Sequence, residues 1–120
     1  MQVGYVVLYV TDPEACRRFW LEQVGMVEKG RKEAAGFVIA EVGFADQAFS
    51  FELVPLALMK DNPSRLDLAT PSICFRTKDL AASREALVAK GVTASEIGAH
   101  GGMQTFAFCD NEGRWFAVAG

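Results

Sequence analysis

The sequence lacks most of the features that would assign a function at once. Its 120 residues contain one histidine and only three widely spaced cysteines, Cys16, Cys74 and Cys109, which excludes a disulfide framework and a thiolate zinc site. The net charge of −3 provides no basic surface for nucleic acid or an anionic membrane. No apolar run approaches the roughly 18 residues of a membrane helix, and the chain does not start with a signal-like segment. We therefore expect a cytoplasmic protein with neither nucleic-acid nor membrane partners.

What is present suits one globular domain. A chain of this length buries roughly two thirds of the surface that it exposes when unfolded, which is enough for an apolar core. The hydrophobic fraction of 51% and the charged fraction of 22% are ordinary for a soluble domain and exclude a disordered chain. We predict a single domain over residues 1–120.

The second half of the chain repeats the first. When Asp12 is aligned with Asp79, Arg17 meets Arg84, and a β-branched, apolar segment precedes the aspartate in both halves. A long period that occurs only twice indicates two similar supersecondary units rather than a solenoid. We predict unit one over residues 1–54, a connector over 55–71 and unit two over 72–120.

The elements of unit one are predicted in the order β-α-β-β-β. Asp12 can cap a helix, Pro13 suits its first turn, and Gly25 is placed to end it in a left-handed conformation. Between these residues the apolar side chains recur every three to four positions. The predicted elements are strand Gly4–Val10, helix Pro13–Val24, and strands Met26–Lys29, Gly36–Val42 and Ala48–Val54, with turns at Gly30–Ala35 and Gly43–Gln47.

Unit two is predicted to repeat this order. Asp79 caps a helix whose Leu80, Leu87 and Val88 share one face, and Gly91 follows its end. The connector is polar and rich in proline, and we expect a helical turn at Leu56–Met59. The predicted elements of unit two are strand Ser72–Thr77, helix Leu80–Lys90, strands Thr93–Ile97, Met103–Cys109 and Arg114–Ala119, a flexible loop at Gly98–Gly102 and a turn at Asp110–Gly113.

Together these features resemble the vicinal oxygen chelate superfamily, which includes glyoxalase I, extradiol dioxygenases, fosfomycin-modifying enzymes and the metal-free bleomycin resistance proteins. The segments that carry the resemblance are Tyr5–Asp12, Phe19–Gly25 and Phe106–Phe116, within the two β-α-β-β-β units. The resemblance covers essentially the whole chain and is specific for the fold, although a fold alone does not fix a function. It implies an α+β protein in which two tandem units form a curved mixed sheet with a concave cleft and one helix per unit on the convex side. It also implies a homodimer.

The resemblance locates the positions that hold a metal ion in the metal-dependent members. Each unit supplies one ligand from its first strand and one from its last, and in this sequence the four positions fall on Tyr5, Glu52, Ser72 and Ala117. Alanine has no donor atom and serine is a weak neutral donor, whereas a divalent ion needs several N, O or S donors. The only histidine, His100, lies in the predicted loop. We therefore predict no metal and no other cofactor at these positions.

The same positions indicate which residues line the predicted cleft. Because side chains alternate between the two faces of a strand, the residues that share parity with the four positions lie on the concave face. These residues mix aromatic rings with a few polar groups, as expected for a small-molecule pocket. The predicted ligand-binding residues are Tyr5, Tyr9, Glu52, Ser72, Arg76, Phe106 and Trp115, where Phe106 is included on the assumption of a simple register in the last hairpin.

Several of these residues also have a purely structural interpretation. Tyr5 and Tyr9 can be ordinary packing residues, and Trp115 can be a pocket wall or a dimer contact. Glu52 lies between two apolar neighbours, so it must be hydrated, paired or functional. One structural alternative for Glu52 is an ion pair with Arg76, which could instead orient a ligand carboxylate.

Two functions follow from these candidates. The first is a metal-free binding protein of the bleomycin-resistance type that sequesters an aromatic or cationic molecule, because binding needs only shape, stacking rings and a charge or two. The alternative is a lyase, isomerase or dioxygenase-like enzyme of the same fold, with Glu52 as acid or base and Arg76 or His100 in support. The enzyme would lack a metal to stabilise an enolate or to activate oxygen. The sequence therefore favours the binding protein.

Overall fold

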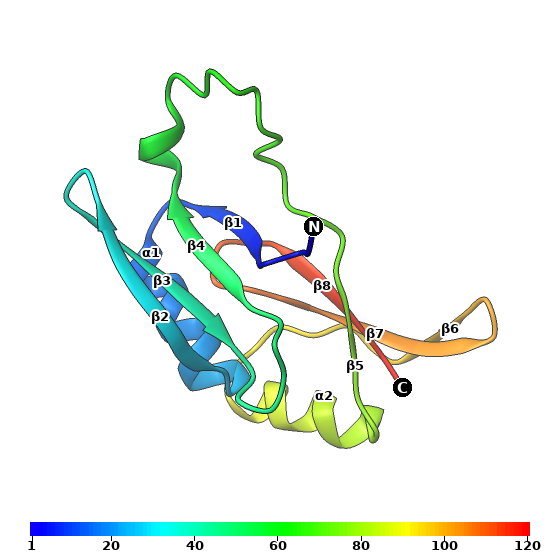
Figure 1. The fold of residues 1–120 in the computed structure, drawn as a ribbon. Helices are drawn as coiled ribbons and strands as arrows, with labels where there is room; N and C mark the ends of the chain where they lie inside the picture. The colour runs from blue at the N-terminus through cyan, green and yellow to red at the C-terminus, as the bar shows by residue number, and fades with distance from the viewer. The chain divides into compact units, whose positions relative to one another are not determined.

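A computed structural model describes the backbone of residues 1–120 and every side chain except that of His100. The chain divides into two compact units, Met1–Thr70 and Pro71–Gly120 (Figure 1). Each unit holds one mixed four-stranded sheet with a helix, so the predicted α+β class with two β-α-β-β-β units is confirmed. Within the described residues, none of the helices combines the length and the apolar character needed to cross a membrane.

The sheet of unit one has the strand order β1-β4-β3-β2. Strand β1 pairs with β4 in parallel, whereas β3 runs antiparallel to both of its neighbours. The helical turn expected in the connector is present as a 3-10 helix, η2. Unit one contains β1 (Val6–Val10), α1 (Pro13–Arg18), η1 (Phe19–Val24), β2 (Val27–Ala34), β3 (Phe37–Gly43), β4 (Phe51–Pro55) and η2 (Leu56–Met59).

The helix of unit one begins and ends at the predicted residues. The carboxylate of Asp12 accepts a hydrogen bond from the backbone N–H of Ala15 at 3.1 Å, and Pro13 is the first helical residue. The second half of the helix, η1, is a π-helix and ends at Gly25, whose φ of 93° is left-handed. Glycine adopts this conformation without the penalty that other residues incur.

The helix packs on one face of the unit-one sheet (Figure 1). The consecutive residues Phe19 and Trp20, the first two of η1, are both buried. The ring of Trp20 lies 5.0 Å from that of Phe51 on β4, centroid to centroid. Leu8 and Leu53 are buried on the same face of the sheet, so this is the helix-facing core that side-chain alternation predicts.

The hairpin of β2 and β3 is longer than predicted. The expected turn at Gly30–Ala35 is wrong, because β2 continues through Gly30 with a β-bulge between Glu28 and Gly30. The true turn is two residues, Ala35 with φ 50° and Gly36 with φ 82°, the pair of positive values found in type I′ hairpins. The charged residues that make β2 look like a loop are typical of an edge strand, where they discourage pairing with other chains.

The sheet of unit two has the order β5-β8-β7-β6. Its parallel pair, β5 and β8, repeats the β1–β4 pair of unit one. Asp79 caps the helix through the backbone N–H of Ala82 at 3.0 Å, as predicted. Unit two contains β5 (Cys74–Arg76), α2 (Leu80–Ala89), β6 (Gly98–His100), β7 (Met103–Cys109) and β8 (Trp115–Ala119).

Phenylalanine rings form the core of unit two. Phe108 on β7 stacks on Phe116 of β8 with centroids 5.7 Å apart, and Phe75 of β5 lies 6.0 Å from Phe108. Phe106 and Val118 are buried on the same face of the sheet. Three strands of the sheet therefore contribute to one aromatic core.

The buried stripe of α2 is narrower than predicted. Leu80 is buried and Leu87 is half-buried, but Val88 is 45% exposed, so the prediction that all three share the buried face is wrong for Val88. A residue seven positions after Leu80 returns to within about 20° of it around the helix, whereas the eighth is about 80° away. Val88 therefore points toward solvent.

The region before β7 also differs from the prediction. The expected strand at Thr93–Ile97 is reduced to an isolated bridge at Ala94, and the expected loop at Gly98–Gly102 contains β6. The backbone of His100 pairs with that of Met103, while its side chain lies outside the described set. A three-residue strand rich in glycine and alanine carries no local signal, because pairing with β7 alone makes it a strand.

Candidate functional site

The face of the unit-one sheet opposite α1 holds a group of polar side chains, Lys32, Glu41, Ser50 and Glu52, which we call the polar cluster. Glu52 follows Phe51 on β4, and the ring of Phe51 packs against the helix. Because neighbouring residues on a strand point to opposite faces, Glu52 points away from the helix. Glu41 lies directly beside it on β3. Two mid-sheet strands therefore bring two carboxylates together.

Glu52 is only 8% exposed and is held by an ion pair. The ammonium of Lys32 lies 3.1 Å from its Oε2 atom, and this hydrogen bond raises the pKa of Lys32, with further contributions from the charges of Glu52, Tyr5 and Glu41. A buried carboxylate needs such a partner. The alternative ion pair of Glu52 with Arg76, a residue of unit two, stays a prediction.

Glu41 is oriented by a different contact. Its Oε1 atom accepts a hydrogen bond from the hydroxyl of Ser50 at 2.5 Å, and Ser50 is buried. At Gly30 a Cβ atom would lie 3.3 Å from the Oε2 atom of Glu41, so glycine on β2 leaves room for the carboxylate. Like charges directly opposite each other across strands repel. The cluster thus holds two carboxylates and one ammonium, with an excess of negative charge.

Two tyrosines lie at or near this face. Tyr9 is half-buried on β1 and its register puts it on the side of Val7 and Glu52, as alternation predicts. Tyr5 precedes β1 and is 45% exposed. Both rings are therefore candidates for ligand contact in unit one.

Unit two has a very different surface on the side opposite its phenylalanine core. Its centre consists of small side chains that the register places next to one another across three strands. We call it the small-residue face, and it is formed by Cys74, Ala107, Cys109 and Ala117. Trp115 lies beside Cys109 on this face and is 52% exposed, so a large, exposed ring borders the small side chains.

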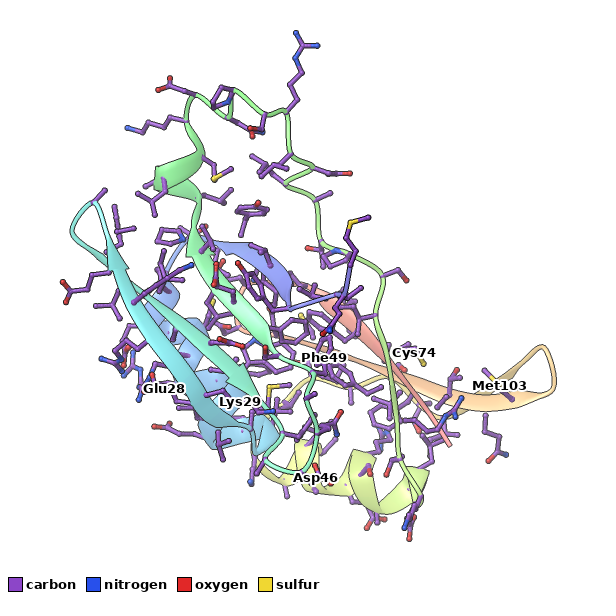
Figure 2. All side chains as sticks on the ribbon, in the orientation of Figure 1. Glu28, Lys29, Asp46, Phe49, Cys74 and Met103 are labelled. Atoms are coloured by element: carbon purple, nitrogen blue, oxygen red, sulfur yellow. The ribbon has the colours of Figure 1, made fainter. Side chains whose placement is uncertain are left out.

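The remaining unit-two candidates lie around this face. Arg76 shares the parity of Cys74 on β5 and is exposed, and Ser72 is exposed just before that strand. Cys74 and Met103 are marked in Figure 2, on β5 and at the start of β7. Cys109 is partly buried, and burial together with the nearby charge of Asp110 raises the pKa of its thiol. Cys109 is therefore a poor nucleophile.

The prediction that Phe106 shares the face of Trp115 is wrong. Phe106 pairs with Val118, whereas Trp115 pairs with Cys109, and these two pairs lie on opposite faces of the sheet. Phe106 is only 2% exposed and belongs to the core. The cause is the length of the turn at residues 110–114, which sets the register of the hairpin.

This turn is built around a buried acid. The Oδ1 atom of Asp110 accepts hydrogen bonds from the backbone N–H groups of Glu112 and Arg114, both at 2.9 Å. Its Oδ2 atom accepts from the guanidinium of Arg114 at 3.0 Å, and Glu112 binds the same guanidinium at 2.8 Å. Burial lowers the pKa of Arg114, but its bonds to Glu112 and Asp110 outweigh burial and raise it. Asp110, Glu112 and Arg114 thus meet one another's needs for hydrogen bonds and opposite charge within the turn, so their role is structural.

Comparison with known families assigns the fold to a named group. The model of the glyoxalase-like domain matches residues 5–119. The chain belongs to this glyoxalase-like family. The resemblance to the superfamily of glyoxalases, bleomycin resistance proteins and dioxygenases is thereby confirmed.

Solved structures share the fold of this glyoxalase-like domain at low sequence identity. TnmS3, an antibiotic binding protein from Streptomyces sp. CB03234, has a TM-score of 0.81 and 19% identity, over 99% of this chain and 94% of that one. UcmS2 has a TM-score of 0.81 and 17% identity, over 99% and 97%. A member of the superfamily from Sphaerobacter thermophilus DSM 20745 has a TM-score of 0.79 and 18% identity, over 99% and 96%. A search of curated proteins finds no match.

The positions that the resemblance assigns to metal ligands do not fit a metal in this glyoxalase-like domain. Ala117 offers no donor atom, Ser72 and Tyr5 offer only hydroxyls, and the carboxylate of Glu52 is bound to Lys32. Among the described side chains, a set that leaves out His100, no three or more His, Cys, Asp or Glu residues form a group that could hold an ion. A divalent cation needs more donors than these positions supply.

Sequence reasoning missed two members of the polar cluster. Glu41 carries the same signal as Glu52, a single acid among the apolar residues of a strand, and that signal could have identified it. Lys32 could not be found in this way, because it lay in a segment predicted as a turn.

Proposed function

We propose that this glyoxalase-like domain binds a small aromatic or cationic molecule and sequesters it without converting it. The observation that carries the proposal is the polar cluster, in which a nearly buried carboxylate, Glu52, sits on the sheet face opposite the helix. The hydrophobic core on the helix side does not need this charge, and burying a carboxylate is costly. A cost of this kind is typical of binding sites, where a few polar groups fix the orientation of a ligand.

Exposed aromatic rings support the same proposal. Trp115 is 52% exposed and Tyr5 is 45% exposed, and both can stack on a flat or cationic ligand. Rings of this size are unfavourable in water and are enriched where proteins bind other molecules. We propose ligand contacts from Tyr5, Tyr9, Glu52, Ser72, Arg76 and Trp115.

The shared fold suggests the class of ligand. TnmS3 is an antibiotic binding protein, and binding without conversion requires only shape, stacking and charge. We therefore propose an antibiotic or a similar aromatic molecule as the ligand, with resistance through sequestration as the biological role. In the enzyme alternative Glu52 acts as acid or base together with Arg76 or His100. We propose binding instead because the Glu52 carboxylate is already engaged by the ammonium of Lys32 within unit one.

The proposal is tested by a thermal-shift screen. The panel contains divalent metals, aromatic antibiotics and small carbonyl compounds, because a ligand that binds only the folded state raises Tm by mass action. We expect aromatic compounds, above all cationic ones, to raise Tm, and metals to leave it unchanged. A chelator-sensitive metal that remains bound in stoichiometric amount after purification, or turnover of a carbonyl compound, would overturn the proposal.

Glu52→Gln then tests the site itself. The substitution keeps the size of the side chain but removes its charge, so we expect a cationic ligand to bind more weakly by about 1 to 3 kcal/mol. The matched control is Glu33→Gln, on the same hairpin but exposed and on the opposite face of β2 from Lys32. Titration calorimetry of both variants decides the matter. If Glu52→Gln lowers Tm but leaves affinity unchanged, Glu52 has only a structural role.

A further inference from the structure

We propose that Lys32 is a displaceable counter-ion of Glu52, so that the cationic group of a ligand takes the place of the Lys32 ammonium in the polar cluster. The inference rests on the proposed function and deepens it, because it selects organic cations over anions. Lys32 would then determine specificity without contacting the ligand, because it competes with the ligand for Glu52.

The two partners of this ion pair differ sharply in their surroundings. The side chain of Lys32 is 57% exposed on the edge strand β2, whereas that of Glu52 is 11% exposed on the central strand β4. The lysine ammonium is at the end of a flexible four-carbon stem and can move into water at little cost. The Glu52 carboxylate cannot reach water in the same way, so it needs another cation when Lys32 leaves.

The rest of the cluster determines the sign of the charge that it attracts. Glu41 lies opposite Glu52, and its hydrogen bond within the cluster comes from the neutral hydroxyl of Ser50. Even with Lys32 in place, the carboxylates outnumber the ammonium. An anionic ligand would be repelled by Glu41, whereas an aromatic cation would replace the ammonium and add a ring that lysine lacks. The cluster therefore favours an aromatic cation.

The test uses two fluorescent dyes as probes, the aromatic cation proflavine and the aromatic anion 8-anilinonaphthalene-1-sulfonate. Lys32→Met removes the ammonium but keeps an apolar stem, and Lys32→Gln, which can still donate a hydrogen bond to Glu52, carries the same test if the methionine variant does not fold. Lys60→Met is the control for overall charge, because Lys60 is exposed at the end of η2, outside the cluster. Each dye is titrated into the full-length protein.

We expect Lys32→Met to bind proflavine about fivefold more tightly than Lys60→Met. This factor corresponds to the loss of one exposed ion pair, because the Lys32 ammonium no longer competes with the dye for Glu52. The anionic dye should gain nothing. Adding Glu52→Gln to Lys32→Met should remove the gain, which a double-mutant cycle measures and which a merely structural role for Lys32 would not produce. If the wild type binds proflavine and Lys32→Met behaves like Lys60→Met, the inference is overturned while the proposed function stands. If no variant binds proflavine, the inference is also overturned, and the wider screen decides the proposed function separately.

Discussion

Asp110 and Glu52 are both buried acids, but they are stabilised in different ways. Asp110 receives its hydrogen bonds from its own turn, two of them from backbone N–H groups, so its partners come with the local chain. Glu52 depends on an exposed side chain from an edge strand. The hydrogen bonds of Asp110 are fixed by its own turn, whereas the ion pair of Glu52 depends on a side chain that is largely exposed to solvent.

We predict that Asp110→Asn destabilises the protein by about 2 to 4 kcal/mol. An asparagine amide would direct N–H groups at the guanidinium of Arg114, which can only donate, and would leave this cation with only one of its two carboxylates. The matched control is Asp79→Asn, which should be nearly neutral because asparagine caps helices about as well as aspartate. Urea unfolding of both variants measures the difference. Equal losses at the two positions would contradict the structural role of Asp110.

Single residues were predictable where the signal is local. The caps Asp12 and Asp79 and the helix end at Gly25 could be placed because capping depends on a few neighbouring residues. Glu52 could be identified as an anomalous acid in an apolar strand. Its partner Lys32 could not, because the ion pair joins strands that only the sheet topology brings together.

At the scale of elements, the end of β3 requires glycine at position 43, because the backbone just before β4 passes very close to it. A Cβ atom there would lie 2.4 Å from the carbonyl oxygen of Phe49 and 3.2 Å from the Cα atom of Ser50. Because both contacts are with backbone, they cannot be relieved by a side-chain rotation. The entry into β4, and with it the position of the polar cluster, depends on this glycine.

We predict that Gly43→Ala costs about 1 to 3 kcal/mol or more, the range for overpacking a site that cannot relax. Gly4→Ala is the control, because a Cβ at Gly4 meets nothing within 4 Å, and we expect a change within about 0.5 kcal/mol. Thermal unfolding distinguishes the two. A Gly43→Ala variant as stable as Gly4→Ala would show that the strand and the loop can separate.

An ion pair joins the helix to the edge strand of unit one. Glu28 on β2, labelled in Figure 2, accepts hydrogen bonds from Arg17 of α1 at 2.8 Å and from Arg31 at 2.9 Å. These bonds, that of Arg17 first, lower the pKa of Glu28. A carboxyl group whose pKa is lowered by folding stabilises the folded state at any pH above the pKa that it has in the unfolded chain. This contribution is lost as the pH falls through the folded-state pKa.

We therefore predict that Glu28→Gln is less stable than the wild type at about pH 7. The difference should begin to shrink as the pH falls below about 4.5, where the unfolded carboxyl takes up its proton, and should disappear below the folded-state pKa. Urea midpoints of both proteins across this range provide the measurement. High salt at neutral pH should reduce the same difference, since the pair is partly exposed. A difference that stays constant with pH would mean that packing, rather than charge, carries the effect.

Elements with caps or strong apolar patterns were predictable, and elements defined by pairing were not. Strand β7 has the predicted bounds Met103–Cys109. In contrast, β6 has no apolar pattern of its own, and β2 is rich in charge. Both are strands because a neighbour supplies their hydrogen bonds, which is a property of the sheet rather than of the segment.

At the scale of the whole molecule, the internal repeat is the feature that sequence reasoning used to best effect. Each unit starts with a strand that pairs in parallel with the last strand of the same unit, and each helix starts at an equivalent aspartate. Periodicity across the chain therefore predicted the architecture of both units. It could not predict the face of Phe106, because one additional residue in a turn moves a side chain to the other side of the sheet.

We propose that the protein assembles as a homodimer, as the superfamily resemblance implies. We predict that light scattering after size exclusion gives twice the chain mass of 13.1 kDa across the micromolar range. Dilution should not change this mass if the interface is of the stable, obligate kind. A constant monomer mass over the same range would contradict the proposal.

The π-helical half of the unit-one helix makes the two repeats differ in the geometry of their helices. A π turn takes up one more residue than an α turn. The chain therefore leaves the unit-one helix after Phe19–Val24 at a different angle around the helix axis than it leaves α2 after Ala89. If α2 replaced the helix of unit one after the capping aspartate, the chain would enter β2 from the wrong position around the helix. We therefore expect that the helices of the two units cannot be exchanged, although the two units share one order of elements.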